Sequence, residues 1–181
     1  MTPKRIVITG GPGSGKTTLI ELLEAKGFPV IHEISRQVIQ EAQAAGIDQL
    51  FLTDPLLFSQ KLMDGRLKQF KQAKAHSEEH LFYDRGLPDV TSYMHYIGAT
   101  YPANFDAPCF KNSYDHVFLL PPWKSIYTQD NERYESFEQA EIIHDHLLKG
   151  YEKYGYTVHL VPVGTPSDRI DHILNKLEIS S

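Results

Sequence analysis

One run of eight residues near the start of the chain, from Gly10 to Thr17, constrains the fold more than any other feature. It reads GGPGSGKT and matches the pattern G-x-x-x-x-G-K-[ST], which is the signature of a phosphate-binding loop. The preceding residues 5–9 are mostly apolar and β-branched, as in a buried parallel strand. The following residues 17–26 carry leucine and isoleucine at helical spacing and run to Gly27, a residue typical of helix ends. Together the strand, loop and helix predict that the chain binds a nucleoside triphosphate.

The residue types of this loop suit the binding of phosphate groups. Glycines let the backbone curl so that successive N–H groups point inward at phosphate oxygens. The positive end of the following helix dipole adds to the attraction. We expect Lys16 to reach the β- and γ-phosphates and the Thr17 hydroxyl to bind Mg²⁺. The predicted nucleotide-binding residues are Gly11, Pro12, Gly13, Ser14, Gly15, Lys16, Thr17 and Thr18.

Length and charge limit what kind of protein this is. The 181 residues are enough for one α/β domain with a sizeable core, and no repeat or linker divides them. A hydrophobic content of 41% and a charged content of 23% are ordinary for a soluble globular protein. The net charge of −5 disfavours general binding to nucleic acid or to anionic membranes, because both need a basic surface. We expect a single domain over residues 1–181 that binds neither nucleic acid nor membrane.

The cysteine content and the hydropathy of the chain indicate where in the cell the protein is expected. Cys109 is the one cysteine of the chain, so an internal disulfide and a cysteine-based metal site are both excluded. The apolar run at the N-terminus is too short for the core of a signal peptide. No segment approaches the roughly 20 apolar residues of a membrane span. We therefore expect a cytoplasmic location.

Strand and helix patterns alternate along the chain, which predicts a parallel sheet with helices on both faces. After the first strand, further strands are expected at 28–32, 81–83, 116–120 and 157–161. Helices are expected at 35–45, from about 54 to an end between 76 and 80, at 88–97, 103–112, 137–154 and 167–177. The expected fold class is therefore α/β: a three-layer P-loop NTPase fold with a five-stranded parallel sheet.

The long helix that begins near Asp54 carries basic residues between its apolar positions. A solvated polar face explains these residues better than a stripe for nucleic acid does. We therefore expect this helix to be scaffold. The basic residues are Lys61, Arg66, Lys68, Lys71 and Lys74.

Polar residues follow three of the expected strands. Ligands of open parallel sheets bind at the carboxyl ends of the strands, so these residues are candidates for function. Those in question are Glu33, Arg36, Asp84, Arg85, Asp130 and Arg133.

The two acidic candidates have different expected roles. Asp84 follows three apolar residues, as a magnesium-binding aspartate at a strand end does, although a helix-capping role is the alternative. Glu33 could be the general base that takes a proton from an acceptor hydroxyl, or it could hydrogen-bond the acceptor. The alternative for Glu33 is an exposed or capping glutamate. Asp84 and Thr17 are the predicted metal ligands.

The arginines are candidates because phosphoryl transfer depends on positioning and on the stabilisation of charge. Arg133 lies in the long polar stretch 123–136 and could close over the nucleotide as a lid arginine. Arg36 and Arg85 could hold a substrate phosphate or carboxylate through bidentate contacts. Each of the three could instead form a surface salt bridge. Tyr96 could line the acceptor pocket.

Five segments together resemble one known family. The segments are 10–17, Glu33-Ile34-Ser35-Arg36, 83–89 with Tyr93, Asp130 with Arg133, and 151–162. The family is the AAA-type ATPase/kinase family related to the ribosylnicotinamide kinase domain of the bacterial NAD-biosynthesis regulator. The resemblance runs over nearly the whole chain, and its P-loop is specific for nucleotide binding.

More distantly, the arrangement is similar to that of deoxynucleoside kinases. Those enzymes carry a base glutamate after strand two, an acid–arginine pair after strand three, and lid arginines. By that resemblance Glu33 takes the base role, Asp84 with Arg85 forms the acid–arginine pair, and Arg133 belongs to the lid. No nucleoside-reading pattern accompanies these residues, so the resemblance implies no particular acceptor.

These observations favour a small P-loop kinase-like enzyme. It is expected to bind ATP with Mg²⁺ and to pass the γ-phosphoryl group to a small hydroxyl-bearing acceptor, with a nucleoside-like metabolite as the leading candidate. The alternative is a regulatory ATPase or nucleotide-binding module with a protein or lipid partner.

Overall fold

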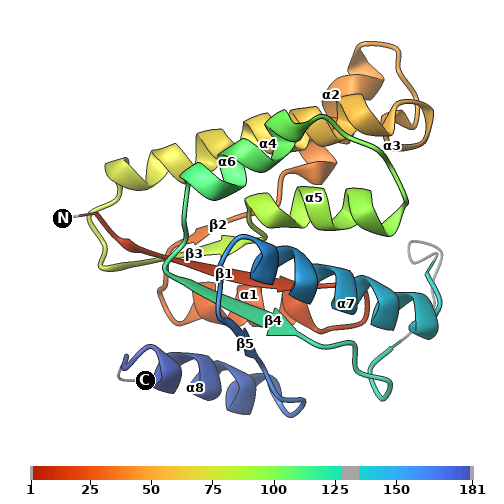
Figure 1. Ribbon diagram of the computed structural model, residues 1–181. Helices are drawn as coiled ribbons and strands as arrows, with labels where there is room; N and C mark the ends of the chain where they lie inside the picture. The colour runs from red at the N-terminus through yellow and green to blue at the C-terminus, as the bar shows by residue number, and fades with distance from the viewer. Residues whose placement is uncertain (1, 128–134, 180–181) are drawn as a thin grey trace.

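The computed structural model describes residues 2–127 and 135–179, and its centre is one parallel β-sheet. The strand order is β2-β3-β1-β4-β5, so β1, which leads into the phosphate loop, lies between β3 and β4 (Figure 1). The predicted five-stranded parallel sheet is thereby confirmed. The strands are β1 Lys4–Gly10, β2 Val30–Ile31, β3 His80–Asp84, β4 His116–Leu120 and β5 Val158–Leu160.

The helices fall close to their expected positions, with two differences. A short helix, α3, was not predicted, and the expected helix at 103–112 is a 3-10 turn at Ala103–Phe105 followed by α6. The helices are α1 Lys16–Ala25, α2 Ser35–Ala44, α3 Leu50–Thr53, α4 Pro55–Gln72, α5 Leu87–Tyr96, α6 Asp106–Lys111, α7 Phe137–Lys153 and α8 Pro166–Lys176. Within the described residues, no helix combines the length and apolar character that crossing a lipid bilayer requires.

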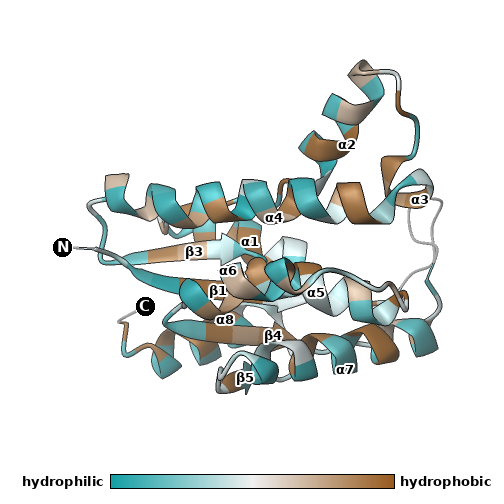
Figure 2. Ribbon diagram, turned by 45° about the horizontal axis from the view of Figure 1, so that its top comes forward, coloured by the Kyte–Doolittle hydropathy of each residue, from teal (hydrophilic) through white to brown (hydrophobic). Residues whose placement is uncertain are grey.

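Helices cover both faces of the sheet because side chains alternate along each strand. Val7 of β1 packs in a core with residues of α4, α5 and α7. Its neighbours Ile6 and Ile8 point the other way, into a core with residues of α1 and α8. Figure 2 shows hydrophobic colouring along much of β3 and β4, between these two layers of helices. The result is the three-layer arrangement expected of the fold.

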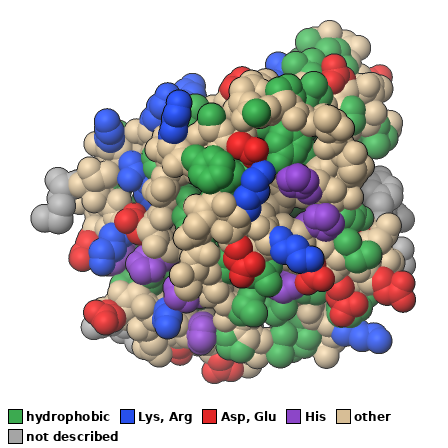
Figure 3. Space-filling view, in the orientation of Figure 1, with side chains coloured by type: hydrophobic (Ala, Val, Ile, Leu, Met, Phe, Trp, Pro, Cys, Tyr) green, Lys and Arg blue, Asp and Glu red, His purple; other side chains and the backbone are tan. Residues whose placement is uncertain are grey.

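Helix α4 begins as its sequence predicts, because the Asp54 side chain accepts a hydrogen bond from the Leu57 N–H at 3.0 Å and Pro55 follows. The solvated face predicted for its basic residues holds for the lysines, all of which are exposed. Figure 3 shows blue Lys and Arg side chains on the surface at the upper left, where α4 lies in Figure 1. The prediction is wrong for Arg66, whose residue is 4% exposed. Arg66 lies four residues after Leu62 and four before Phe70, so it belongs to the buried stripe of the helix.

Candidate active site

The phosphate loop has the backbone that its glycines predict. Gly13 and Gly15 have φ of 70° and 80°, in the left-handed region that side chains disfavour. Gly15 caps α1, and no described side chain accepts a hydrogen bond from the first N–H groups of that helix. Those N–H groups therefore remain free to bind an anion.

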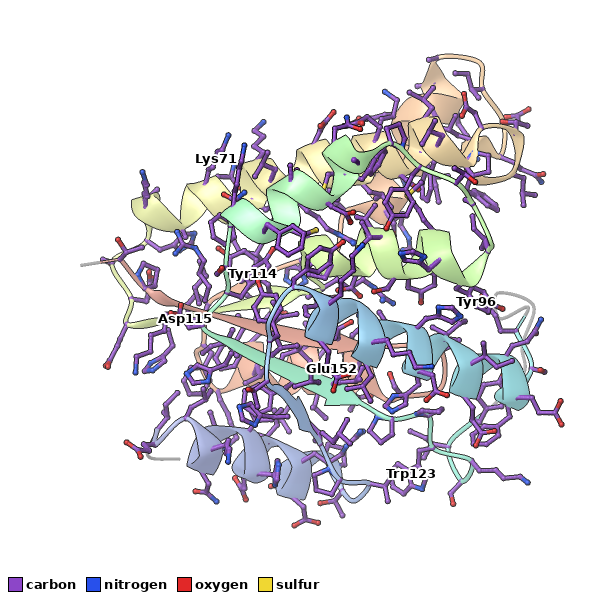
Figure 4. All side chains as sticks on the ribbon, in the orientation of Figure 1. Lys71, Tyr96, Tyr114, Asp115, Trp123 and Glu152 are labelled. Carbon is purple, nitrogen blue, oxygen red and sulfur yellow. The ribbon has the colours of Figure 1, made fainter. Side chains whose placement is uncertain are left out.

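Residues after β4 pack against this loop. The Trp123 N–H donates to the Gly13 carbonyl at 3.0 Å. A Cβ atom added at Gly13 would lie 2.2 Å from Cδ2 of Tyr127, so any larger residue would collide with that ring. Figure 4 shows Trp123 in the loop after β4. Asp130 and Arg133 lie outside the described residues, as does the rest of segment 128–134, which is half of the predicted lid.

Lys16 and Asp84 form an ion pair between the phosphate loop and the end of β3. The pairing follows from the sheet, because Asp84 is the register partner of Ile8 on the neighbouring strand β1. Each side chain is only 11% exposed. Burial and the charge of Arg85 lower the pKa of Lys16, whereas Asp84 opposes that shift. Asp84 is not a helix cap, which removes the alternative weighed for it from the sequence.

Glu33 is the centre of a charged cluster at the ends of β2 and β3. Nη2 of Arg66 donates to its two carboxylate oxygens at 2.9 and 3.0 Å, and Nε of Arg85 lies 2.7 Å from Oε2. The Ile34 and Ser35 N–H groups donate to Oε1 at 2.9 Å. Burial by itself would raise the pKa of Glu33, but the charges of Arg66 and Arg85 outweigh it and lower the pKa to about 2. Glu33 is therefore ionised at neutral pH.

Asp89 fixes the other side of Arg85. Nη1 of Arg85 donates to Oδ1 of Asp89 at 3.2 Å, and the Gly86 N–H donates to Oδ2 at 2.9 Å. Thr9 of β1 and Tyr151 of α7 also donate hydrogen bonds to this fully buried carboxylate. Arg85 itself has a φ of 72°, a conformation that non-glycine residues rarely adopt. The cluster thus holds Arg85 in place from both sides.

A cavity of about 730 Å³ opens beside this cluster. The charged residues Glu33, Arg66, Arg85 and Asp89 line one part of it. Apolar side chains of α3, α4 and α5 and of the residue after α5 line much of the rest, among them Phe51, Phe58, Leu62, Val90, Met94 and Ile97. The polar residues Ser35, Gln49, Ser59 and Glu135 also line the cavity. Its size lies within the usual range of small-molecule pockets.

The structure brings together most of the residues predicted from the sequence. Tyr96, labelled at the end of α5 in Figure 4, lines the cavity together with Glu33 and Arg85. Arg36 is exposed on α2 and is not among the described residues that line the cavity. Thr17 and Thr18 are exposed at the start of α1.

Sequence reasoning missed two charged members of the site, Arg66 and Asp89. The signal for Arg66 was its position in the apolar stripe of α4, where a charged side chain needs a buried partner. Asp89 lay within the segment 83–89 that carried the family resemblance, but nothing local indicated that it would be buried.

Comparison with known proteins gives a family and a set of similar folds. The model of the AAA domain family matches residues 5–169. A search of curated proteins found no match to the sequence. Deoxyadenosine kinase from M. mycoides, solved with dCMP and dCDP, aligns with a TM-score of 0.68 at 19% identity, over 96% of this chain and 98% of that one.

A second similar structure is longer than this chain. The NadR protein in complex with NR aligns with a TM-score of 0.74 at 16% identity, over 99% of this chain and 52% of NadR. The chain thus spans about half the length of NadR. At these identities the likeness to both structures is a likeness of fold.

Proposed function

The chain belongs to the AAA domain family, and from this premise we propose that it is a single-domain P-loop phosphotransferase that uses ATP with Mg²⁺. The main support for the proposal is that two adjacent residues at the end of β3, Asp84 and Arg85, contact the phosphate loop and the cavity respectively. Asp84 pairs with Lys16 of the phosphate loop, and Arg85 lines the cavity. A phosphate donor on the loop would therefore lie next to whatever molecule fills the cavity.

The donor site uses the loop and its ion pair. The free N–H groups at the start of α1 would hold phosphate oxygens, and Lys16 would leave Asp84 to contact the β- and γ-phosphates. Asp84 would then be free for the metal, and its carboxylate and the Thr17 hydroxyl are oxygen ligands of the kind that Mg²⁺ prefers. When bound, Mg²⁺ neutralises negative charge on the phosphates. Arg133, on the predicted lid at 123–136, is proposed to add a further positive charge.

The charge balance of the cavity supports a neutral acceptor. Its described lining holds three carboxylates, those of Glu33, Asp89 and Glu135, against the two guanidinium groups of Arg66 and Arg85. Both arginines are committed to carboxylates, so neither is free to bind an anionic substrate. We therefore propose that the acceptor is an uncharged alcohol, such as a nucleoside-like metabolite, whose apolar or aromatic body packs on the cavity wall.

Glu33 is proposed to receive the acceptor hydroxyl. As an ionised carboxylate it accepts hydrogen bonds, and its contacts with Arg66 and Arg85 hold it beside the phosphate loop. A pKa of about 2 makes Glu33 a weak base. Phosphoryl transfer has a loose transition state that needs little proton removal before the phosphorus–oxygen bond forms. Orientation of the hydroxyl is therefore the larger part of the role that we propose for Glu33.

The test measures ADP release with Mg·ATP and a panel of neutral nucleosides, vitamins and other alcohols. Each neutral compound is paired with its phosphorylated form, and Lys16→Ala serves as the inactive control. We expect at least one neutral compound to speed ADP release in the wild type while its phosphorylated form does not. Equal rates across the panel would favour a regulatory ATPase, and stimulation by the phosphorylated forms alone would overturn the neutral acceptor.

A further inference from the structure

A buried arginine of the C-terminal helix contacts the phosphate loop. Arg169 of α8 is 155 positions from Ser14, yet its Nη1 donates to the Ser14 carbonyl at 2.8 Å. Its Nε donates to the carbonyl of Pro162, in the loop after β5, at 3.0 Å. The residue is 2% exposed. One side chain therefore ties the loop after β5 to the phosphate loop, on the face of the sheet where α1 and α8 pack (Figure 1).

The charge of Arg169 is not compensated within the described part of the chain. Two other arginines near the site, the buried Arg66 and the half-buried Arg85, both pair with carboxylates, whereas Arg169 has no ion pair with any described residue. Its buried Nη2 also lacks a hydrogen-bond partner there. A buried cation without a counter-ion is unfavourable, and an anion bound nearby removes that cost.

The contact also sets the direction of a backbone N–H group. In a planar trans peptide the carbonyl and the N–H point in opposite directions. Because the Ser14 carbonyl points at Arg169, the Gly15 N–H points away from it. A Cβ atom at Gly15 would lie 2.9 Å from Nη1 of Arg169, so a larger residue there would push the guanidinium away, and the φ of 80° at Gly15 favours glycine as well.

We propose that Arg169 is a positioning residue for the polyphosphate chain of the nucleotide. It holds the peptide between Ser14 and Gly15 so that the N–H faces the phosphates, and its charge is balanced by the bound polyanion. The P-loop pattern does not include this residue, which comes from the opposite end of the chain. The inference rests on the proposed function, since it assumes that the loop binds a polyphosphate.

The test compares the dissociation constants of two probes, Mg·ATP and inorganic tripolyphosphate, in four proteins. These are the wild type, Arg169→Met, Arg169→Lys and the matched control Lys176→Met, which removes an exposed positive charge from the same helix. Arg169→Met removes a positive charge behind the loop and the contact that orients the Ser14–Gly15 peptide, so we expect it to weaken both probes by about tenfold to a hundredfold. Arg169→Lys should recover part of that loss, and Lys176→Met should stay within about twofold of the wild type.

Circular dichroism shows which variants fold, and affinities are compared only between folded proteins. If Arg169→Met does not fold, the test uses Arg169→Lys. A single ammonium group cannot donate to both the Ser14 and the Pro162 carbonyls as the guanidinium does, so this variant should still bind both probes at least threefold more weakly than the wild type. Unchanged affinities in a folded variant would overturn the inference. Weaker binding of ATP with unchanged binding of tripolyphosphate would also overturn it, because Arg169 would then affect the nucleoside part of ATP rather than its phosphates. A wild type that binds tripolyphosphate but not ATP would refute the proposed function and leave this inference standing.

Discussion

Replacement of Arg66 by methionine tests the charged cluster most sharply. Methionine keeps an unbranched apolar side chain in the buried stripe of α4 but removes the charge that faces Glu33. The Glu33 carboxylate would keep Arg85 and its two backbone donors. We expect the variant to fold with a lower free energy of unfolding and with a higher pKa at Glu33.

The magnitude follows from the pKa of Glu33. A fall from 4.5 to about 2 corresponds to about 3 kcal/mol of stabilisation by the surrounding charges and donors, net of burial. Loss of one partner from a buried pair costs about 3–5 kcal/mol. Because Glu33 is 21% exposed and keeps Arg85, we expect Arg66→Met to cost about 3 kcal/mol at pH 7, the lower end of that range.

The pH dependence gives a second, independent check. The pKa of Glu33 is lower in the folded than in the unfolded state, so its ionisation stabilises the fold above pH 4.5 and that contribution is lost as the pH falls towards 2. Arg66→Met brings the two pKa values closer together. The difference in stability between wild type and variant should therefore shrink by up to about 2 kcal/mol between pH 7 and pH 3.

Urea denaturation followed by circular dichroism, at several pH values, measures these quantities. Lys68→Met removes an exposed charge from the same helix and should change stability by no more than about 0.5 kcal/mol. A loss below about 1 kcal/mol for Arg66→Met at pH 7 would refute the reasoning. A difference from the wild type that does not vary with pH would refute the link to Glu33.

Three further predictions concern the nucleotide and the acceptor. Asp84→Asn should remove most of the Mg²⁺ dependence of ATP binding. In calorimetric titrations, chelation of the metal should weaken ATP binding by the wild type but change the affinity of the variant by less than about twofold. Gly13→Ala should weaken ATP binding at least tenfold by collision with Tyr127, whereas Gly46→Ala, at φ 82° with nothing within 4 Å of its Cβ, should leave binding unchanged. Glu33→Gln should bind ATP within about threefold of the wild type yet lose transfer to an acceptor, and unchanged transfer would remove Glu33 from the mechanism.

The parts of the site that the sequence predicted are those that local rules determine. The loop from Gly10 to Thr17 is contiguous, so its glycines and its lysine could be assigned from spacing. Glu33 and Asp84 could be placed together because the ends of parallel strands meet at one edge of the sheet. The short helix α3 was missed because four residues carry too little periodicity to predict a helix.

The parts that the sequence did not predict depend on contacts between distant segments. Asp89 is bonded to Thr9 and Tyr151, which lie 80 and 62 positions away, and no local pattern links these residues. Arg66 and Arg169 share a feature that was visible in the sequence. Each is a charged residue in the apolar stripe of a helix, and each donates to a backbone carbonyl, that of Gly86 after β3 for Arg66 and that of Ser14 in the phosphate loop for Arg169. For Arg66 the charge favours exposure, whereas its position in the apolar stripe of α4 favours burial, and the structure shows burial.

Calorimetric titration of the protein with Mg·ATP tests the central claim most directly, because every proposed role depends on a polyphosphate bound by the loop and Lys16. The account predicts saturable binding at a single site in the wild type. It also predicts affinity at least tenfold weaker in a folded Lys16→Met variant, which loses a charged contact to the phosphates. A wild type that binds no nucleotide, or a Lys16→Met variant that binds it equally well, would contradict the account.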